Sequence, residues 1–301
     1  MHTMRKDAPL VLARRSLLGL AGGDAFGETM FGEPADSARR AAQRLISTRR
    51  PWRWTDDTAM ALSIVEVLGR HATIEPDALA AAFVRRWSDD PHRGYGHGAF
   101  NLLTRVSYGA PWRTEARGLF NGQGSFGNGA AMRAAPIGGY FAGDLDRVAA
   151  AALRSAEPPH AHPDGAAGAV AVAVAAAVAA SGGGGGTLLE EAVRWTPPGN
   201  TRAGIERAAA TDLAADPGEV GRALGTGLEV AAHDTVPFCL WVAARHLGSY
   251  EDALWTAASQ HGDRDTMAAI VGGIVVLATG EDQIPALWRA ATEPVPDPLA
   301  G

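Results

Sequence analysis

The stretch Trp54-Thr55-Asp56-Asp57-Thr58 places two adjacent carboxylates between two hydroxyl groups, directly before an apolar segment that runs to Gly69. A similar cluster, Gly262-Asp263-Arg264-Asp265-Thr266, opens the apolar segment Met267–Ala278. Neighbouring carboxylates repel one another unless positive charge offsets them. Carboxylate and hydroxyl oxygens are the ligands that Mg²⁺ and Mn²⁺ prefer. We therefore expect two helix starts that face each other across one metal site.

Helix capping is the alternative explanation for both clusters. Asp and Thr are common N-cap residues, and either cluster taken alone fits that role. Both clusters, however, hold more acids than a cap requires, and each has a Thr beside its carboxylates. From the residues alone, capping and metal binding both remain open.

Apolar residues at helical spacing recur along the whole chain, and no segment alternates with a period of two. We predict an all-α fold, a single compact domain of orthogonally packed helices over residues 10–295, after a disordered tail at residues 1–9. The main predicted helices are Leu10–Ala25, Asp56–Gly69, Pro76–Trp87, Ala99–Val106, Leu145–Ser155, Gly165–Ala180, Leu188–Arg194, Ala203–Ala215, Val220–Leu224, Val236–His246, Tyr250–Ser259, Arg264–Thr279 and Gln283–Ala291.

The composition restricts the class of protein. The chain has 301 residues, a net charge of −6 and one cysteine, Cys239. Without a second cysteine no internal disulfide forms, which fits a reducing cytoplasm. No run of Lys or Arg indicates nucleic-acid binding, although a basic cleft is not excluded. Gly165–Ala180 is too short for a typical membrane span, and we interpret it as a core helix. We expect a cytoplasmic monomer that does not bind membranes.

Two glycine-rich stretches read as loops. The stretch Asn121–Gly129 holds too much glycine for a helix or strand, and it opens the short helical run Ala130–Arg133. Successive glycine N–H groups beside a helix start can bind phosphate, while a tight structural turn is the alternative. The second stretch, Ser181–Gly186, reads as a surface connector. His160 and His162 precede the next long helix, where they can bind substrate, ligate metal or cap the helix.

Taken together, these segments resemble the ADP-ribosylglycohydrolase family over about Ser16–Gly280. Five motifs occur in the family order, and together they are specific although each alone is weak. They are Gly19-Leu20-Ala21-Gly22-Gly23-Asp24-Ala25-Phe26-Gly27, Trp54-Thr55-Asp56-Asp57-Thr58, Gly127-Asn128-Gly129-Ala130-Ala131-Met132-Arg133, His160–Gly165 and Gly262-Asp263-Arg264-Asp265-Thr266.

The resemblance implies an all-α hydrolase with two divalent cations, Mg²⁺ or Mn²⁺, in a cleft. The metal ligands that it implies are Thr55, Asp56, Asp57, Asp263, Asp265 and Thr266. The residues that it assigns to the diphosphate and distal ribose of ADP-ribose are Gly124, Ser125, Phe126, Gly127, Asn128 and Gly129, with His160 near that ribose. Asp56 or Asp57 is the natural general base, although metal binding lowers the pKa of an aspartate and weakens it as a base.

The chain departs from the family pattern at Phe31, Pro159, His261 and Arg264, of which the first has the greatest consequence. The family places a glutamate seven residues after the first motif's aspartate, and here that position is Phe31, flanked by Glu28 and Glu33. We expect Glu28 to take the catalytic role, because it directly follows the turn at Gly27. The central Arg264 of the last motif replaces a small residue, so it can reach a phosphate or the leaving group.

These features lead to three functional hypotheses. The first is a hydrolase that releases ADP-ribose from a protein side chain, with arginine expected first. The second is a hydrolase of another ADP-ribosyl carrier, such as serine, a nucleic-acid base or a small ester. The third is a protein that binds ADP-ribose without cleaving it.

Overall fold

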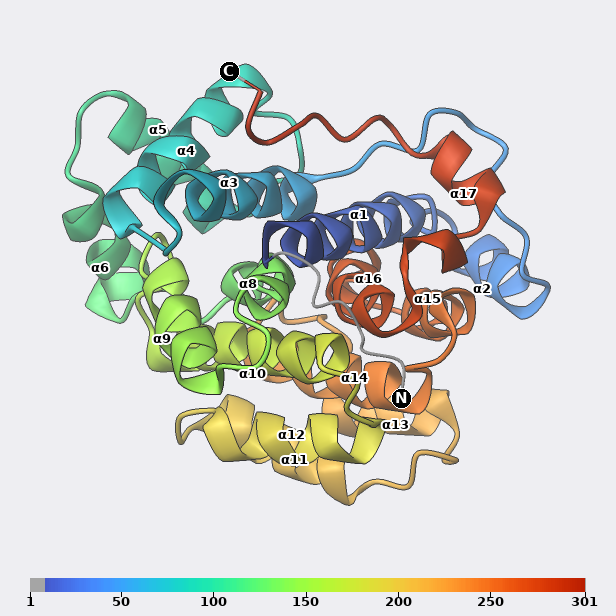
Figure 1. Cartoon of the computed structure of the whole chain (residues 1–301). Helices are drawn as coiled ribbons and strands as arrows, with labels where there is room; N and C mark the ends of the chain where they lie inside the picture. The colour runs from blue at the N-terminus through green and yellow to red at the C-terminus, as the bar shows by residue number, and fades with distance from the viewer. Residues whose placement is uncertain (1–8, 301) are drawn as a thin grey trace.

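The structure is a computed structural model that describes residues 9–300. Among these residues every regular element is a helix, and only two isolated β-bridges occur (Figure 1). The predicted all-α fold is therefore confirmed. The predicted tail lies outside the described residues apart from Pro9, which begins α1. The helices are α1 Pro9–Glu28, α2 Pro34–Ala42, α3 Asp56–His71, α4 Pro76–Asp89, α5 His97–Ser107, α6 Trp112–Gly122, α7 Gly129–Met132, α8 Ala135–Tyr140, α9 Leu145–Ala156, α10 Pro163–Ala180, α11 Gly185–Trp195, α12 Asn200–Ala210, α13 Pro217–Leu224, α14 Ala232–Arg245, α15 Tyr250–Ser259, α16 Arg264–Thr279, η1 Glu281–Gln283 and α17 Ala286–Ala291.

Among the described residues, α1 and α16 form the most extensive helix contact. Gly19, Gly23 and Gly27 recur every fourth residue, so they form one face of α1. A Cβ atom at Gly23 would lie 2.1 Å from the carbonyl oxygen of Ala268, and one at Gly27 would lie 2.4 Å from that of Arg264. Only glycine permits this approach. The contact brings the C-terminal half of α1 beside the first turn of α16.

The Ala/Val helix α10 forms the centre of the fold. It packs against α7, α8, α9, α11, α14 and α16. By length and composition it is apolar enough to cross a membrane, yet 83% of its 18-residue window is buried inside the protein. Its small side chains allow neighbouring helices to surround it on every side, as expected for a core helix.

Several helices differ from the predictions. For example, α12 spans Asn200–Ala210 where Ala203–Ala215 was expected, and α14 begins at Ala232 and not at Val236. Helices α6 and α8 were not predicted, because α6 carries only one buried residue, Ala116, and α8 spans only six residues. The expected loop Ser181–Gly186 ends early, since α11 already begins at Gly185. A Cβ atom at Gly185 would lie 2.3 Å from the carbonyl oxygen of Ala244, so close packing against α14 explains a glycine in this helical turn.

The C-terminal segment returns to the middle of the chain. After α17 it runs past α1 towards α3 (Figure 1), and Leu299 lies against Gly69. Backbone hydrogen bonds join Trp52 to this segment, with Trp52 N–H donating to Ala291 and Glu293 N–H donating to Trp52. The segment that leads into α3 is thereby held by the end of the chain.

Candidate active site

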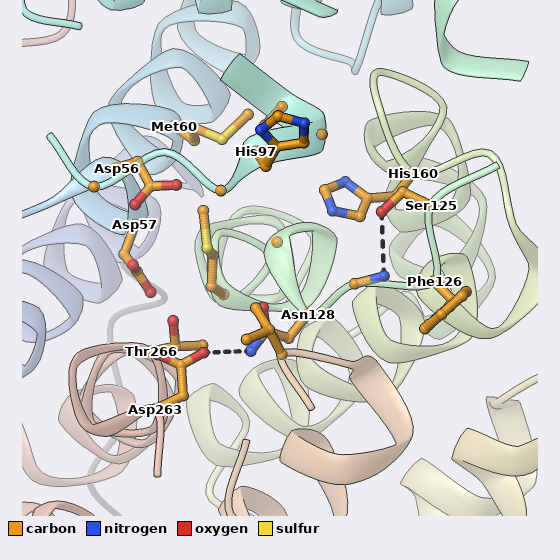
Figure 2. Close-up of a pocket in the computed structure, with 18 of the residues that line it drawn as sticks. Asp56, Asp57, Met60, His97, Ser125, Phe126, Asn128, His160, Asp263 and Thr266 are labelled. Carbon is orange, nitrogen blue, oxygen red and sulfur yellow. Dashed lines mark hydrogen bonds between the residues drawn. The ribbon is translucent and has the colours of Figure 1, made fainter. Parts of the chain in front are cut away.

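The two acid-bearing helix starts meet at one end of a cavity of about 400 Å³. Asp56 and Asp57 project from the first turn of α3, and Asp263, Asp265 and Thr266 come from the start of α16 (Figure 2). All five line the cavity. The structure therefore brings together residues some two hundred positions apart in the sequence, as the sequence analysis expected.

A further acid, Asp24, which the sequence analysis did not include among the ligands, belongs to the same cluster. One carboxylate oxygen of Asp24, one of Asp57 and one of Asp265 lie within 4.8 Å of one another. Asp24 is the only acid in the apolar middle of α1, and that isolation was the available signal. It reaches the cluster because the glycine contact holds α1 against α16.

The hydrogen bonds of Asp24 give it a capping role. Its carboxylate accepts from the backbone N–H and the hydroxyl of both Thr55 and Thr58. These N–H groups belong to the start of α3, whose own N-cap residue, Thr55, makes no side-chain cap. Asp24 thus caps α3 from a different helix, and its acceptor capacity is largely used.

Thr55 is buried beside this cap and does not line the cavity. Its hydroxyl lies between two carboxylates, 2.9 Å from Asp24 and 3.0 Å from Asp57. Capping and acid clustering therefore occur together at α3. The two explanations that the residues left open are both part of the same local structure.

The acid cluster carries more negative charge than its surroundings neutralise. Burial, with the charges of Asp24 and Asp263, raises the pKa of Asp56 to about 8. Burial, with the charge of Asp265, raises the pKa of Asp263 to about 8. Burial and neighbouring acids also raise the pKa of Asp57 well above its usual value. A bound cation is the usual means by which such a cluster stays ionised.

Two oxygens in the cluster have no partner within the described residues. They are Oδ1 of Asp57 and Oδ1 of Asp265, both buried without a hydrogen bond. Buried polar atoms are almost always satisfied, so such atoms call for an explanation. Unpaired carboxylate oxygens beside threonine hydroxyls match the donor set of a hard divalent cation. The residues present therefore fit the metal site that the motifs indicated.

The glycine-rich loop forms the opposite wall of the cavity (Figure 2). Five of its six predicted residues line the cavity, from Ser125 to Gly129. Gly124 lies behind them with φ +76°, next to the backbone of Ala161 and His162. The Asn128 amide donates to Oδ2 of Asp263 at 2.7 Å, so the loop is tied directly to the acid cluster.

His160 is buried, and its ring lines the cavity beside the loop (Figure 2). A Cβ atom at Gly129 would lie 2.7 Å from Cε1 of His160, so the loop and the ring are in close contact. Burial and the neighbouring Arg133 hold the pKa of His160 well below its usual value, which keeps the ring neutral. Arg133 itself donates to the carbonyl oxygens of Gly129 and Pro158, and so joins the loop to the segment that carries the histidine.

Two aromatic rings lie at the loop end of the cavity. The centroids of Phe120 and Phe126 are 5.7 Å apart, and Phe120 is 51% exposed. Phe120 has φ +52°, a left-handed conformation that non-glycine residues seldom adopt. Phe126 also packs against His162, which accepts from Asp164 N–H as the N-cap of α10. Of the three roles left open for His162, the structure therefore shows capping.

Several cavity residues were not among the predicted site residues. The loop before α5, the first turn of α5 and the segment before α14 supply most of them, and no motif marks any of these segments. Val230, for example, has φ +53° although it is β-branched, and its carbonyl accepts from Asn128 N–H. The cavity residues outside the prediction are Met60, Gly94, Gly96, His97, Gly98, Ala99, Phe120, Met132, Glu229 and Val230.

The residues around the missing glutamate lie beside the cavity rather than in it. Glu28 ends α1 one turn after Asp24, and its charge reaches Asp265, whose pKa it helps to raise. Glu33 precedes α2 and is exposed, and Phe31 is 45% exposed. Arg264 is buried and donates to the carbonyl oxygens of Met30 and Gln260, so it supports the chain instead of reaching into the cavity.

The chain is similar to several known proteins. A family model described as ADP-ribosylglycohydrolase matches residues 6–300. The ADP-ribosylhydrolase ARH3 of Gallus gallus is 30% identical over 297 residues, covering 87% of this chain and 77% of that protein. The ARH3 of Homo sapiens is 30% identical over 275 residues, covering 80% and 74%. A solved structure named ADP-ribosylglycohydrolase-related protein complex shares the fold, with a TM-score of 0.65 and 20% identity, covering 95% of this chain and 93% of its own. These matches confirm the resemblance that the motifs indicated.

Proposed function

Because this chain belongs to the ADP-ribosylglycohydrolase family, we propose that it is a metal-dependent hydrolase that releases ADP-ribose from a protein side chain. The observation that carries the proposal is the two-ended cavity. One end gathers acids with two buried, unpaired oxygens, and the other end is a glycine-rich loop beside a neutral histidine and two aromatic rings, of which Phe120 is exposed and Phe126 is partly buried.

The acid end would hold two divalent cations, Mg²⁺ or Mn²⁺. Such cations, when bound, offset the charge of the carboxylates and act as Lewis acids towards the ribose and the attacking water. The residues that would hold them are Thr55, Asp56, Asp57, Asp263, Asp265 and Thr266. The unpaired oxygens of Asp57 and Asp265 make these two the central ligands of the proposal.

The loop end would bind the ADP part of the substrate. Backbone N–H groups of the segment from Ser125 to Gly129 are suited to a diphosphate, and its two glycines add no side chain between backbone and phosphate. The N–H groups of Gly127 and Asn128 already donate to Ser125 Oγ and to the carbonyl oxygen of Val230, so the other N–H groups of the segment are the candidates. The neutral ring of His160 can exchange a hydrogen bond with a ribose hydroxyl. Phe120 and Phe126 offer a stacking surface for adenine, because every base has an aromatic face.

Hydrolysis requires a group that accepts a proton from water. The water oxygen forms a bond to the anomeric carbon, the bond from that carbon to the acceptor atom breaks, and the acceptor leaves with a proton. Glu28 is our proposed base, because it lies one helical turn from Asp24 and close enough to influence Asp265. Asp56 or Asp57 is the alternative base.

Arginine is the acceptor that we propose. Five acids line the cavity, namely Asp56, Asp57, Glu229, Asp263 and Asp265, and none of the lining residues is a lysine or arginine. Four of these acids are proposed metal ligands, and Glu229 is the lining carboxylate outside that set. A guanidinium group is cationic and can pair with the Glu229 carboxylate, whereas a serine acceptor is neutral.

A panel of substrates tests the proposal. Proteins ADP-ribosylated on arginine or on serine, an ADP-ribosylated nucleic-acid base and a small ADP-ribose ester are incubated with and without Mg²⁺ or Mn²⁺, and free ADP-ribose is measured. We expect metal-dependent release from the arginine substrate. Release from another carrier alone would reject arginine as the acceptor.

Phe31 favours a second candidate function, a protein that binds ADP-ribose without cleaving it. Calorimetry with ADP-ribose distinguishes the two. Binding without release from any member of the panel would reject the hydrolase and support the binder.

A further inference from the structure

Arg93 contacts the start of α3 through both its backbone and its side chain. Its carbonyl oxygen accepts from Asp56 N–H at 2.7 Å. Its guanidinium donates to the carbonyl oxygen of Trp54 and lies 3.6 Å from the centroid of the Trp54 ring. The side chain is only 10% exposed. Arg93 therefore holds the two residues on either side of Thr55.

Glu293 fixes the orientation of this guanidinium. Its two carboxylate oxygens accept from two nitrogens of Arg93, at 2.7 Å and 2.8 Å. Two parallel hydrogen bonds of this kind fix the orientation of the guanidinium group as well as its distance from the carboxylate. Glu293 is itself held by the backbone bond from its N–H to Trp52. The pair therefore connects the C-terminal segment to the acid cluster across 200 residues of sequence.

The geometry makes Asp56 sensitive to the position of Arg93. The next residue, Gly94, has φ +92°, and a Cβ atom there would lie 3.4 Å from Oδ1 of Asp56. This loop thus forms a wall against the Asp56 carboxylate while its carbonyl group holds the Asp56 backbone. A shift of Arg93 changes both contacts together.

A second ion pair in the same C-terminal segment has none of these features. Arg14 and Asp297 meet at 2.7 Å, with side chains 42% and 52% exposed. The side chain of Asp297 accepts from Arg14 and from the backbone N–H of Leu299, and neither Arg14 nor Asp297 lines the cavity. Exposed ion pairs contribute little to stability. Asp297 therefore provides a matched control for Glu293.

We propose that Arg93 and Glu293 are positioning residues, which set the orientation of Asp56 and thereby the affinity of the site for divalent cations. This inference rests on the metal site of the proposed function. It adds that the C-terminal segment, which has no motif of its own, helps to orient a metal ligand of the site.

Calorimetry with Mn²⁺, well below the melting temperature, tests the inference on the full chain. Variants are Glu293→Gln, Arg93→Lys and the control Asp297→Asn, each checked for folding by circular dichroism. Loss of a residue that orients a metal ligand typically weakens metal affinity about 10–100-fold. We expect losses in this range for Glu293→Gln and Arg93→Lys, and no change for Asp297→Asn.

The outcomes separate the two levels of the proposal. Wild type that binds no Mn²⁺ would reject the metal site and this inference with it. Wild-type affinity in a folded Glu293→Gln variant, with or without a lower melting temperature, would overturn the inference alone. If Arg93→Lys fails to fold, Glu293→Gln still decides, because it leaves Arg93 free to contact Trp54 and Asp90.

Discussion

The two ends of the cavity are built by different means. At the acid end, charged side chains stand on the first turns of two long helices and are buried against a third. At the loop end, the surface is made of glycine backbone, aromatic rings and residues with unusual φ angles, such as Phe120 and Val230. Binding at the acid end therefore depends on which charges are present. Binding at the loop end depends on how closely the backbone can approach the ligand.

This difference predicts different responses to mutation. At the acid end a carboxylate can be replaced by an amide of the same shape, so that only charge changes. At the loop end a replacement that changes only charge should have little effect on ligand binding. Removal of an aromatic ring, or of the space that glycine leaves beside the backbone, should weaken binding instead. The two ends are linked by the bond from Asn128 to Asp263, so they are separable but not independent.

The largest effect is expected at Asp57 and Asp265. Asp57→Asn and Asp265→Asn each remove a charged oxygen that has no other partner in the described residues. We expect metal-dependent hydrolysis to fall below detection and the rise in melting temperature caused by Mn²⁺ to disappear, because a ligand stabilises only the state that binds it. Differential scanning calorimetry with increasing Mn²⁺ measures the shift.

Without metal, the same substitutions should not lower the stability of the protein. Removing one of several buried carboxylates that repel one another should leave Asp57→Asn at least as stable as wild type without metal. Asp146→Asn, at an exposed position in α9, is the control and should keep the full Mn²⁺ shift. A normal Mn²⁺ shift in both site variants would mean that the acid end does not hold the metal.

The same contrast explains what the sequence revealed. The acids of α3 and α16 were visible because a charge beside an apolar helical run is a local pattern, and so was the fold class. Asp24 is equally close to the site but was not included, since its role depends on the glycine contact between α1 and α16. The predicted roles of the site residues are a separate question, which the mutations address.

Only part of the loop end could be predicted from the sequence. The glycine run itself was clear, whereas Phe120 and Val230 take left-handed conformations that no local residue pattern specifies. Their positions follow from tertiary contacts, such as the bond from Asn128 N–H to Val230. The pair of Arg93 and Glu293 was invisible for the same reason, because its members are far apart in the sequence.

The next largest effect is expected at Glu28, at the edge of the acid end. If Glu28 takes the proton from water, Glu28→Gln should lower turnover about 10²–10⁴-fold at saturating metal, as is typical for loss of a general base. Glu33→Gln is the matched control, because Glu33 is exposed in the loop before α2. Single-turnover kinetics with both variants provide the measurement. Equal turnover in Glu28→Gln and wild type would transfer the role to Asp56 or Asp57.

The smallest effect is expected at the loop end, where Phe126→Ala removes one of two rings. Stacking of a base on an aromatic side chain contributes about 1–3 kcal/mol, which corresponds to about 5–150-fold in affinity. We expect ADP-ribose binding to weaken within this range in calorimetry, while ribose 5-phosphate, which has no base, binds as it does to wild type. Phe100→Ala is the control, since Phe100 packs on Trp87 and does not line the cavity. An equal loss of affinity for both ligands would show that Phe126 supports the loop and does not stack on the base. Ligand binding at the loop end would then depend on the rings only because they hold the loop backbone in place.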